Sequence, residues 1–340
     1  MNTSKKLFLH APNVHVGGGL SLLRALYALP ELNVAVEQLD IRAQASLTPV
    51  SASTYWVHPT FFSRLSAELR LRRQVEAKDV VLCFHGLVPL LPLRGEVTVF
   101  LQNRILLSPA SLKTFPLKTR LRLWLERSML KAFAHRVKKF VVQTPSMAEQ
   151  ARAFLGDLTP VVVCPFVIAQ FNEQRAVVAE KRFDFIYVAS AEPHKNHQKL
   201  LAAWCLLAQQ GLRPELALTV PFSSPIADRI EELKQTWGLN ISNFGHVSPQ
   251  QVAALYDQSN ALIYPSLTES LGLPLIEAQS RHLPIVAAEL DYVRDVVEPV
   301  ETFDPRSQTS IARAVSRFMG IEQVVQPMNG PEVFLREVLR

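Results

Sequence analysis

Cysteine is scarce in this sequence. Cys83, Cys164 and Cys205 are the three cysteines among 340 residues, and they are too far apart to form a metal-ligand motif. Scattered thiols of this kind fit a reducing compartment and buried structural roles. We therefore expect a cytoplasmic protein.

Long apolar runs are also missing. No uncharged run reaches the roughly 18 residues that a membrane-spanning helix needs. The first ten residues start with a basic stretch but contain few apolar residues, so we expect a first strand and not a signal peptide. The composition, 48% hydrophobic and 19% charged, is that of a globular protein, and 340 residues suit two domains of ordinary size.

The sequence contains no Asp-X-Asp pair. Such carboxylates commonly hold a divalent cation against the phosphates of a substrate. We therefore expect no metal site. Any phosphate would be bound by cationic side chains and by the N-termini of helices.

Acidic residues are nearly absent from residues 104–139, where Glu126 is the only one. Leucines and Trp124 interleave with bases there, which predicts an amphipathic helix with a basic face. Such a face binds an anionic membrane surface, or it is simply a solvated helix face, and both interpretations stay open. Nucleic-acid binding is less favoured because no nucleic-acid module accompanies the charge. The bases are Arg104, Lys113, Lys118, Arg120, Arg122, Arg127, Lys131, Arg136, Lys138 and Lys139.

Strand-like and helix-like segments alternate along the chain, which predicts an α/β fold with parallel sheets covered by helices on both faces. In the first half we expect strands at 6–10, 34–38, 80–84, 97–101, 140–143 and 161–163, and helices at 20–29, 117–134 and 145–155. In the second half we expect strands at 184–188, 216–220, 241–244 and 261–264, and helices at 197–210, 225–237, 249–258 and 307–318.

The alternation is lost near residues 165–181, where charges collect. We therefore predict one domain over residues 1–168 and a second over residues 169–320. A last helix in residues 321–340 would either cross back to the first domain or pack on its own domain.

One stretch combines a strand, a polar loop and a helix start. Residues 261–264 are apolar, Glu269 stands in the loop, and Gly272-Leu273-Pro274 opens the helix. Proline is favoured at the first helical position, and the free N–H groups of a helix start suit a phosphate. Glu277, expected in the first turn, adds a second carboxylate. A phosphate cradle with two acids that bind hydroxyl groups is what a nucleotide-sugar needs.

A second turn between a strand and a helix carries a cation. Lys195 follows the strand at 184–188, and such turns lie at the carboxyl edge of a parallel sheet, where ligands bind. A fixed cation there can neutralise a diphosphate leaving group. The alternative is an ordinary exposed lysine, which we favour less because Glu269 and Glu277 accompany it.

These motifs, taken in order, resemble the family 4 glycosyltransferases, which have the GT-B fold. The resemblance covers the C-terminal half through FIYVASAEPHKNH (185–197), GHVSP (245–249), YPSLTESLGLPLIEA (264–278) and FDP (303–305). The N-terminal half matches loosely, through Val16-Gly17-Gly18-Gly19. The resemblance implies two Rossmann-like domains facing across a cleft. The C-terminal domain would bind the sugar donor and the N-terminal domain the acceptor.

The resemblance also implies roles for single residues. Lys195 would meet the diphosphate, Glu277 the ribose hydroxyls and Glu269 the transferred sugar. Where the family often carries an arginine, this chain has Ser190, which puts part of the usual phosphate contact in doubt.

Backbone groups complete the implied donor site. The N–H groups of Ser270, Leu271 and Gly272 would meet the sugar or the phosphates, and Gly272 permits close approach because it lacks a Cβ. The backbone of His246 and Val247 would lie near the base.

The expected contribution of the N-terminal half is less specific. Gly17, Gly18 and Gly19 are expected in a tight loop that borders the cleft. His85 closes the strand at 80–84 and is either a cleft histidine that contacts the transferred sugar or a structural histidine. The polar cluster Gln102, Asn103 and Arg104 follows the strand at 97–101 and would contact acceptor or sugar.

The resemblance implies a retaining, metal-independent glycosyltransferase that uses a nucleoside-diphosphate sugar and no other cofactor. The acceptor would be a glycan or a lipid-linked oligosaccharide in bacterial O-antigen or capsule synthesis, at the inner face of the cytoplasmic membrane. Two alternatives remain open. The spacing of Glu269 and Glu277 opposes a nucleotide-sugar epimerase of the same fold. Ser190 leaves room for an inactive sugar-binding or scaffolding homologue.

Overall fold

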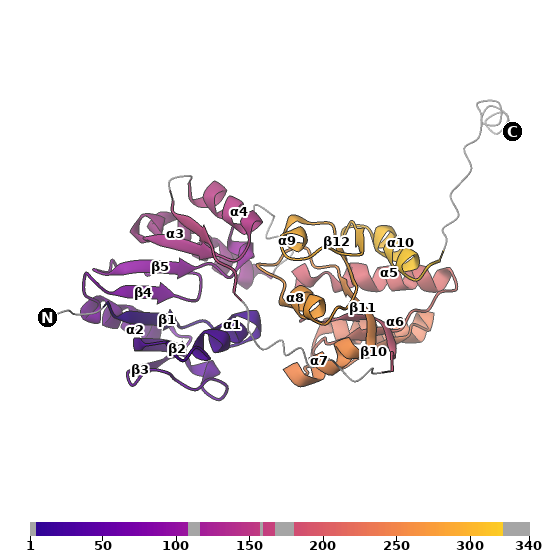
Figure 1. Ribbon diagram of the computed structural model, residues 1–340, viewed down its shortest axis with the longest axis horizontal. Helices are drawn as coiled ribbons and strands as arrows, with labels where there is room; N and C mark the ends of the chain where they lie inside the picture. The colour runs from indigo at the N-terminus through magenta and orange to yellow at the C-terminus, as the bar shows by residue number, and fades with distance from the viewer. Residues whose placement is uncertain (1–4, 108–115, 157–158, 167–179, 322–340) are drawn as a thin grey trace, which may run out of the picture.

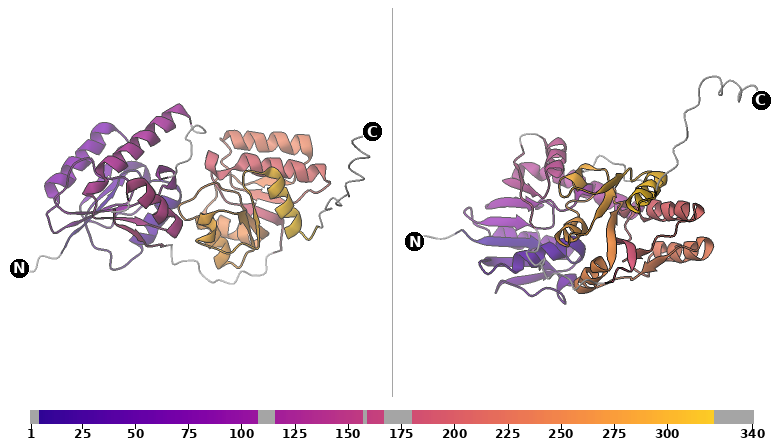
Figure 2. Two further views of the ribbon diagram at one scale, coloured as in Figure 1. Left: turned by 90° about the horizontal axis from the view of Figure 1, so that it is seen from above. Right: turned by 45° about the vertical axis from the view of Figure 1, so that its right-hand side comes forward.

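The structure, a computed structural model, describes residues 5–107, 116–156, 159–166 and 180–321. These residues form two sheets, and every strand pairing in both is parallel. The strand orders are β3-β2-β1-β4-β5-β6-β7 and β10-β9-β8-β11-β12-β13. The predicted α/β fold is confirmed, and the two halves lie side by side in Figures 1 and 2.

The first sheet belongs to the N-terminal half. Its strands are β1 (Leu7–Ala11), β2 (Val34–Asp40), β3 (Thr54–Val57), β4 (Val80–Cys83), β5 (Glu96–Phe100), β6 (Lys139–Val142) and β7 (Val161–Val163). Its helices are α1 (Gly17–Tyr27), α2 (Phe61–Gln74), α3 (Leu117–Phe133) and α4 (Pro145–Leu155), with short 3-10 helices η1 (Ile41–Ala43), η2 (Arg104–Leu106) and η4 (Ala134–Arg136).

The second sheet belongs to the C-terminal half. Its strands are β8 (Phe183–Tyr187), β9 (Leu216–Leu218), β10 (Ile241–Asn243), β11 (Ser259–Tyr264), β12 (Ile285–Ala288) and β13 (Glu301–Phe303). Its helices are η5 (Pro193–Lys195), α5 (His197–Gln209), α6 (Pro225–Trp237), α7 (Pro249–Asp257), α8 (Leu273–Ser280), α9 (Asp291–Arg294) and α10 (Gln308–Phe318).

Both faces of the first sheet carry a core. Phe8 and Leu9 are neighbours on β1 and therefore point to opposite faces. Phe8 packs in a cluster that includes residues of α2, α3 and α4, whereas Leu9 packs in a cluster that includes α1. The second sheet has one continuous cluster around Tyr187 and Trp204. Parallel strands that are buried on both faces explain the long apolar segments in the sequence.

Side-chain caps set many of the helix starts. In each case a hydroxyl accepts a hydrogen bond from the N–H three residues later, which satisfies a donor that the helix itself leaves unpaired. The capping residues are Thr60, Thr144, Ser224, Ser248 and Ser307. Proline follows three of them and reinforces the start.

The structure corrects several expectations. Gly17, Gly18 and Gly19 lie in the first turn of α1 and not in a loop. Glycine is tolerated there because first-turn N–H groups need no partner within the helix, while buried leucines at 20, 22 and 23 hold the helix to the sheet. The sequence analysis missed β3 and α2 altogether.

The cysteines also differ from expectation. Cys83 is buried, but Cys205 is half-buried and Cys164 is exposed. The predicted last helix, residues 321–340, falls almost wholly outside the described residues, as does most of the predicted domain boundary. The proposed division at residues 168 and 320 therefore stays a prediction.

Candidate functional site

Lys195 is held at the carboxyl edge of the second sheet by contacts to its backbone. The Tyr187 hydroxyl at the end of β8 donates to the Lys195 carbonyl at 2.8 Å. Asn196 next to it has a left-handed backbone with φ 62°, a conformation that asparagine adopts more readily than most residues. Its Nδ2 donates to the carbonyls of Pro265 at 3.0 Å and Pro305 at 2.7 Å. Three loops that follow different strands are thereby joined.

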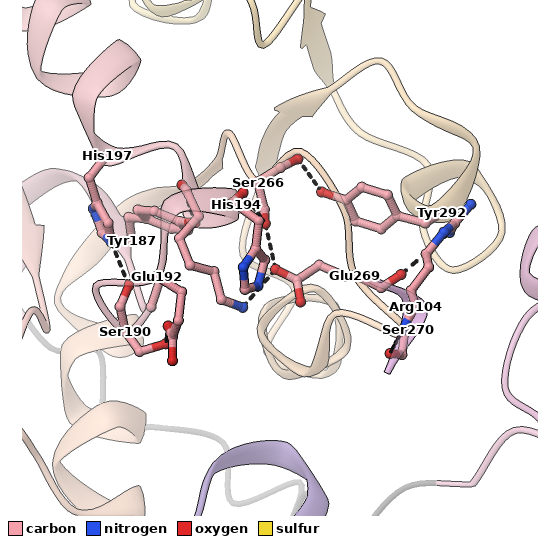
Figure 3. A network of polar contacts seen from close by, with 12 residues as sticks. Arg104, Tyr187, Ser190, Glu192, His194, His197, Ser266, Glu269, Ser270 and Tyr292 are labelled. Carbon is pink, nitrogen blue, oxygen red and sulfur yellow. Dashed lines mark hydrogen bonds and ion pairs between the residues drawn. The ribbon is translucent and has the colours of Figure 1, made fainter. Parts of the chain in front are cut away.

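The side chains of Lys195 and Glu269 meet, and Figure 3 shows Glu269 with its neighbours His194 and Ser266. Lys195 Nζ lies 2.7 Å from Glu269 Oε1, and the side chains are only 17% and 12% exposed. The Ser266 hydroxyl donates to the same oxygen at 2.5 Å. The structure therefore places a shielded cation and a shielded carboxylate in one cluster, although they are far apart in the sequence.

His194 lies beside this pair (Figure 3). Burial, and then the charge of Lys195, lower its pKa below the usual range, so its imidazole is neutral near pH 7. Its Nδ1 is buried and has no hydrogen-bond partner among the described residues. The sequence analysis missed His194, because nothing in its spacing distinguishes it from an ordinary turn residue.

Ser190 and His197 lie on the other side of the same turn. The Ser190 hydroxyl donates to Glu192, and the buried His197 donates from Nε2 to the Ser190 carbonyl at 2.8 Å. Burial lowers the pKa of His197 to about 4. Ser190 itself is exposed. The position where the family often has an arginine is therefore an accessible hydroxyl next to Glu192.

Among the described residues, no side chain caps the helix start after β11. Gly272 caps α8 with φ 75°, and Leu273 and Pro274 are its first two residues. Pro274 is thus the second helical residue and not the first. Glu277 is in the second turn and not in the first, because the helix begins at Leu273.

Glu277 is held by Tyr256, whose hydroxyl donates to Oε2 at 2.9 Å. Burial raises the pKa of Glu277, and the hydrogen bond from Tyr256 and the charge of Arg281 work against this rise. The half-buried carboxylate keeps a second oxygen for a ligand hydroxyl.

The glycine-rich start of α1 reaches the start of α8 from the N-terminal half. A methyl group placed on Gly18 would lie 3.4 Å from Leu273 Cδ1, and one on Gly19 would lie 2.8 Å from Gln102 Oε1. Gly17 has φ 63° and nothing within 4 Å of such a methyl. Two helix N-termini, each favourable for an anion, therefore approach each other between the halves.

The loops after β9 and β10 are joined by Asn243. Its Oδ1 accepts from the N–H of Val220 at 2.9 Å and of Gly245 at 3.3 Å. The exposed ring of Phe222 covers Gly245, where a methyl would lie 2.4 Å from Cε2. His246 is exposed and Val247 half-buried beside it. Phe222 was not identified from the sequence. The signal that could have found it is an aromatic residue in the loop just after a predicted strand.

His85 lies in the N-terminal half and contacts His10. Its Nδ1 donates to the His10 carbonyl at 3.1 Å, and the two rings meet edge to face at 4.9 Å. Burial lowers the pKa of His85 to about 4. His85 is therefore a neutral, half-buried imidazole at the carboxyl edge of β4.

Gln102, Asn103 and Arg104 make structural contacts within the N-terminal half. The Gln102 side chain donates to the Phe84 carbonyl, and Asn103 Oδ1 accepts from the Ile105 N–H at 3.1 Å. Arg104 is only 6% exposed and its Nε donates to Gln150. Their predicted acceptor role stays a prediction.

Within the described ranges, no three His, Cys, Asp or Glu side chains gather in a way that could hold a metal ion. In the same ranges, no helix is long and apolar enough to span a membrane.

The family model for glycosyl transferases group 1 matches residues 169–327. The C-terminal half of the chain is similar to the group 1 glycosyl transferases. The predicted resemblance to family 4 glycosyltransferases with the GT-B fold is confirmed.

Two curated proteins similar to part of this chain come from Escherichia coli. The serotype-specific mannosyltransferase WbdA is 31% identical over 147 residues, which are 42% of this chain and 18% of WbdA. The O-antigen chain mannosyltransferase B is 27% identical over 117 residues, 33% of this chain and 30% of that protein. The chain thus spans less than a third of either relative.

A solved structure extends the likeness to both halves. Anabaena HepE, in complex with UDP and glucose, superposes with a TM-score of 0.67 at 17% identity, over 93% of this chain and 90% of HepE. At this identity the superposition establishes the fold alone. Because it includes the N-terminal half, the superposition supports the predicted GT-B fold for both halves.

Proposed function

We propose that this protein transfers a sugar, with retention, from a nucleoside-diphosphate sugar to a glycan or lipid-linked acceptor in surface-polysaccharide synthesis. The observation that carries the proposal is the shielded Lys195–Glu269 pair next to the N-terminus of α8. A diphosphate would draw Lys195 away from Glu269 and meet the backbone N–H of Leu273 at the start of α8. Glu269 would then be free for a sugar hydroxyl.

The remaining site residues take complementary roles in this proposal. Glu277 binds the ribose diol, and His246 and Val247 border the base, with Phe222 as a stacking surface. Gly17 and Gly18 close over the phosphates from the other half. Ser190 offers a hydroxyl in place of a guanidinium, and His85 faces the transferred sugar.

Three finer points belong to the same proposal. The leaving phosphate takes the proton of the acceptor hydroxyl at the face from which it departs, so retention needs no covalent sugar–enzyme intermediate. Lys195 and the two helix N-termini replace a metal ion. Mannose is the first sugar to test, because WbdA and the O-antigen chain protein are named mannosyltransferases.

Attachment to the inner face of the cytoplasmic membrane is also proposed, through α3. Leu117, Leu121, Trp124 and Leu125 are each 46% to 77% exposed, and their spacing puts them on one face of α3. Lys118 and Arg122 flank this stripe and are exposed. The face predicted to be basic is therefore apolar along its centre, a pattern typical of helices that lie in a membrane interface.

The deciding experiment is incubation with a panel that contains GDP-mannose, UDP-glucose, UDP-galactose and UDP-N-acetylglucosamine. We expect slow hydrolysis and saturable binding of one donor. Conversion of a donor into its epimer would favour the epimerase. Binding without any turnover, with and without glycan acceptors, would favour the inactive homologue.

A further inference from the structure

Arg104 is a buried cation between the two halves. It opens η2 directly after β5 and is 6% exposed. Its Nε donates to Gln150 Oε1 on α4 at 2.9 Å, and its Nη1 donates to the Glu269 carbonyl at 3.4 Å. Both direct partners are neutral, so the compensating charge lies further away. A buried guanidinium is costly unless such partners remain in place.

The compensating charge comes from α9 in the C-terminal half. Asp295 and Asp291 both act on the Arg104 guanidinium, which lies 5.8 Å from the centre of the Tyr292 ring. Asp295 Oδ2 also accepts the Ser146 N–H at 3.0 Å, near the N-terminus of α4. A carboxylate is favourable at a helix N-terminus, so Asp295 serves both α4 and Arg104.

The 265–272 loop is held between these groups. On the N-terminal side, the Arg104 N–H donates to Ser270 Oγ at 3.3 Å, and that hydroxyl donates to the Gln102 carbonyl. On the other side, the Tyr292 hydroxyl donates to the Ser266 carbonyl at 2.7 Å. The loop that carries Glu269 is therefore fastened by Arg104 at Glu269 and Ser270 and by α9 at Ser266 (Figure 3).

We propose that Arg104 is a positioning residue for the donor sugar, an inference that rests on the proposed function. It does not touch the reacting atoms. Its guanidinium and backbone hold the backbone of Glu269 and the hydroxyl of Ser270, and so aim the Glu269 carboxylate at the sugar. Because Asp295 and Ser146 complete the same contact, Glu269 is correctly placed only when the two halves are joined.

This proposal differs from the acceptor role predicted for Arg104 from the sequence. A buried side chain with its donors aimed at Gln150 and Glu269 is not presented to an incoming acceptor. Lysine would not replace it, because an ammonium lacks the planar set of donors that reaches both partners.

The test uses the full chain with Arg104→Met, Arg104→Lys and Asp295→Asn. Arg136→Met is the matched control for an arginine, since Arg136 Nη1 donates to the Leu90 carbonyl within the N-terminal half. Glu298→Gln is the control for Asp295, because Glu298 pairs with Arg294 in the same region. Calorimetry measures binding of GDP-mannose and UDP-glucose, and of the sugar-free nucleotides GMP and UMP.

We expect Arg104→Met to weaken binding of the sugar nucleotide roughly ten- to a hundredfold, the scale for misplacing one group in a site. Arg104→Lys should lose nearly as much affinity for the sugar nucleotide as Arg104→Met. Asp295→Asn should lose less affinity than either. Binding of GMP or UMP should stay at the wild-type level, because Tyr256 holds Glu277, and Asn243 joins the loops after β9 and β10. A purely structural defect would weaken all of these ligands together.

Several results would overturn the proposal. One is wild-type affinity for the sugar nucleotide in both Arg104→Met and Asp295→Asn. Another is a change in the acceptor KM alone, with donor hydrolysis unaltered, which would restore the acceptor role. If Arg104→Met fails to fold, Asp295→Asn decides, since Asp295 is exposed.

Failure of the proposed function would be recognised separately. If the wild type binds no sugar nucleotide, small-angle scattering of the ligand-free proteins tests the joined halves alone. A larger radius of gyration for Arg104→Met and Asp295→Asn than for the two controls would keep Arg104 as the link between the halves. Equal radii would remove that role as well.

Discussion

At the residue scale, the site depends on charged groups that are shielded from water. Lys195 and Glu269 neutralise each other in the ligand-free protein, and Ser266 fixes the carboxylate. In the proposed function, the diphosphate of the donor separates this pair, and each charged group then meets the donor.

Lys195→Ala should lower turnover by about tenfold to a thousandfold, the scale for losing one group that stabilises developing charge. The fold should survive, because the alanine leaves the backbone contacts of Tyr187 and Asn196 intact. Initial-rate kinetics and a thermal unfolding curve check both statements. Lys199→Ala, which removes an exposed lysine on α5, is the control. Activity within twofold of wild type would remove Lys195 from the mechanism.

His197 makes the stability depend on pH. Its pKa is about 4 in the folded protein, below the 6.5 of an unperturbed histidine. Between these values the unfolded state binds a proton that the folded state does not, so stability falls as the pH drops from 6.5 to 4. The full effect is roughly 3 kcal/mol for this single group.

Denaturant unfolding at several pH values should therefore show a shallower pH dependence for His197→Gln than for wild type. His85, whose pKa is also about 4, contributes in the same direction and remains in both proteins. Identical slopes for the two proteins would show that His197 is not the titrating group.

At the scale of elements, the start of α8 depends on one glycine. Gly272 has φ 75°, and a methyl there would lie 2.9 Å from Leu275 Cδ1. Gly272→Ala should lower the free energy of unfolding by about 1–2 kcal/mol, the cost of the left-handed backbone for a residue with a Cβ. It should also weaken donor binding, because the strained cap displaces the free N–H groups.

Gly320→Ala is the matched control, since Gly320 has φ 70° with nothing within 4 Å of the added methyl. It should lose similar stability but bind the donor normally. Equal donor affinity for the two variants would contradict a role for the α8 start.

The apolar stripe of α3 should determine membrane attachment. Leu121→Ser combined with Trp124→Ser should reduce co-sedimentation with anionic vesicles, because it removes the side chains that enter the interface. Lys118→Gln combined with Arg122→Gln should reduce it less and make it less sensitive to salt, since each base near such a surface is worth about 1 kcal/mol. Donor hydrolysis should be unchanged in both.

Lys138, one of the bases of the segment 104–139, is a weaker choice for this test. Lys138 is paired with Glu96 at 3.1 Å, at the start of β6. Equal binding of the wild type to neutral and anionic vesicles, or binding to neither, would return α3 to a solvated helix face.

At the scale of the whole molecule, catalysis should not need a divalent ion. In the proposed function, Lys195 and the N-termini of α1 and α8 would supply the positive charge that a metal would otherwise provide. Activity should therefore persist in excess chelator, measured as donor hydrolysis with and without EDTA. Complete loss that Mg²⁺ or Mn²⁺ restores would contradict the proposed mechanism.

Much of the architecture follows from local patterns in the sequence. The helices at Pro145–Leu155 and Pro225–Trp237 have the predicted bounds, because a capping hydroxyl and a proline mark each start. In contrast, α2 begins with the exposed Phe61 and Phe62, so its apolar pattern does not separate a buried face from a solvent face. Its existence depends on packing against the sheet.

The sequence by itself determined the parallel α/β halves and the chemistry of the C-terminal site, since period, caps and motif spacing are local. Only the tertiary structure decided which residues of different loops contact one another. It joined Lys195 to Glu269, brought Gly18 to the start of α8, and buried Arg104 against the 265–272 loop. These contacts link loops that follow different strands of two sheets. No local pattern encodes such distances, because they depend on how the sheets twist and how the halves meet.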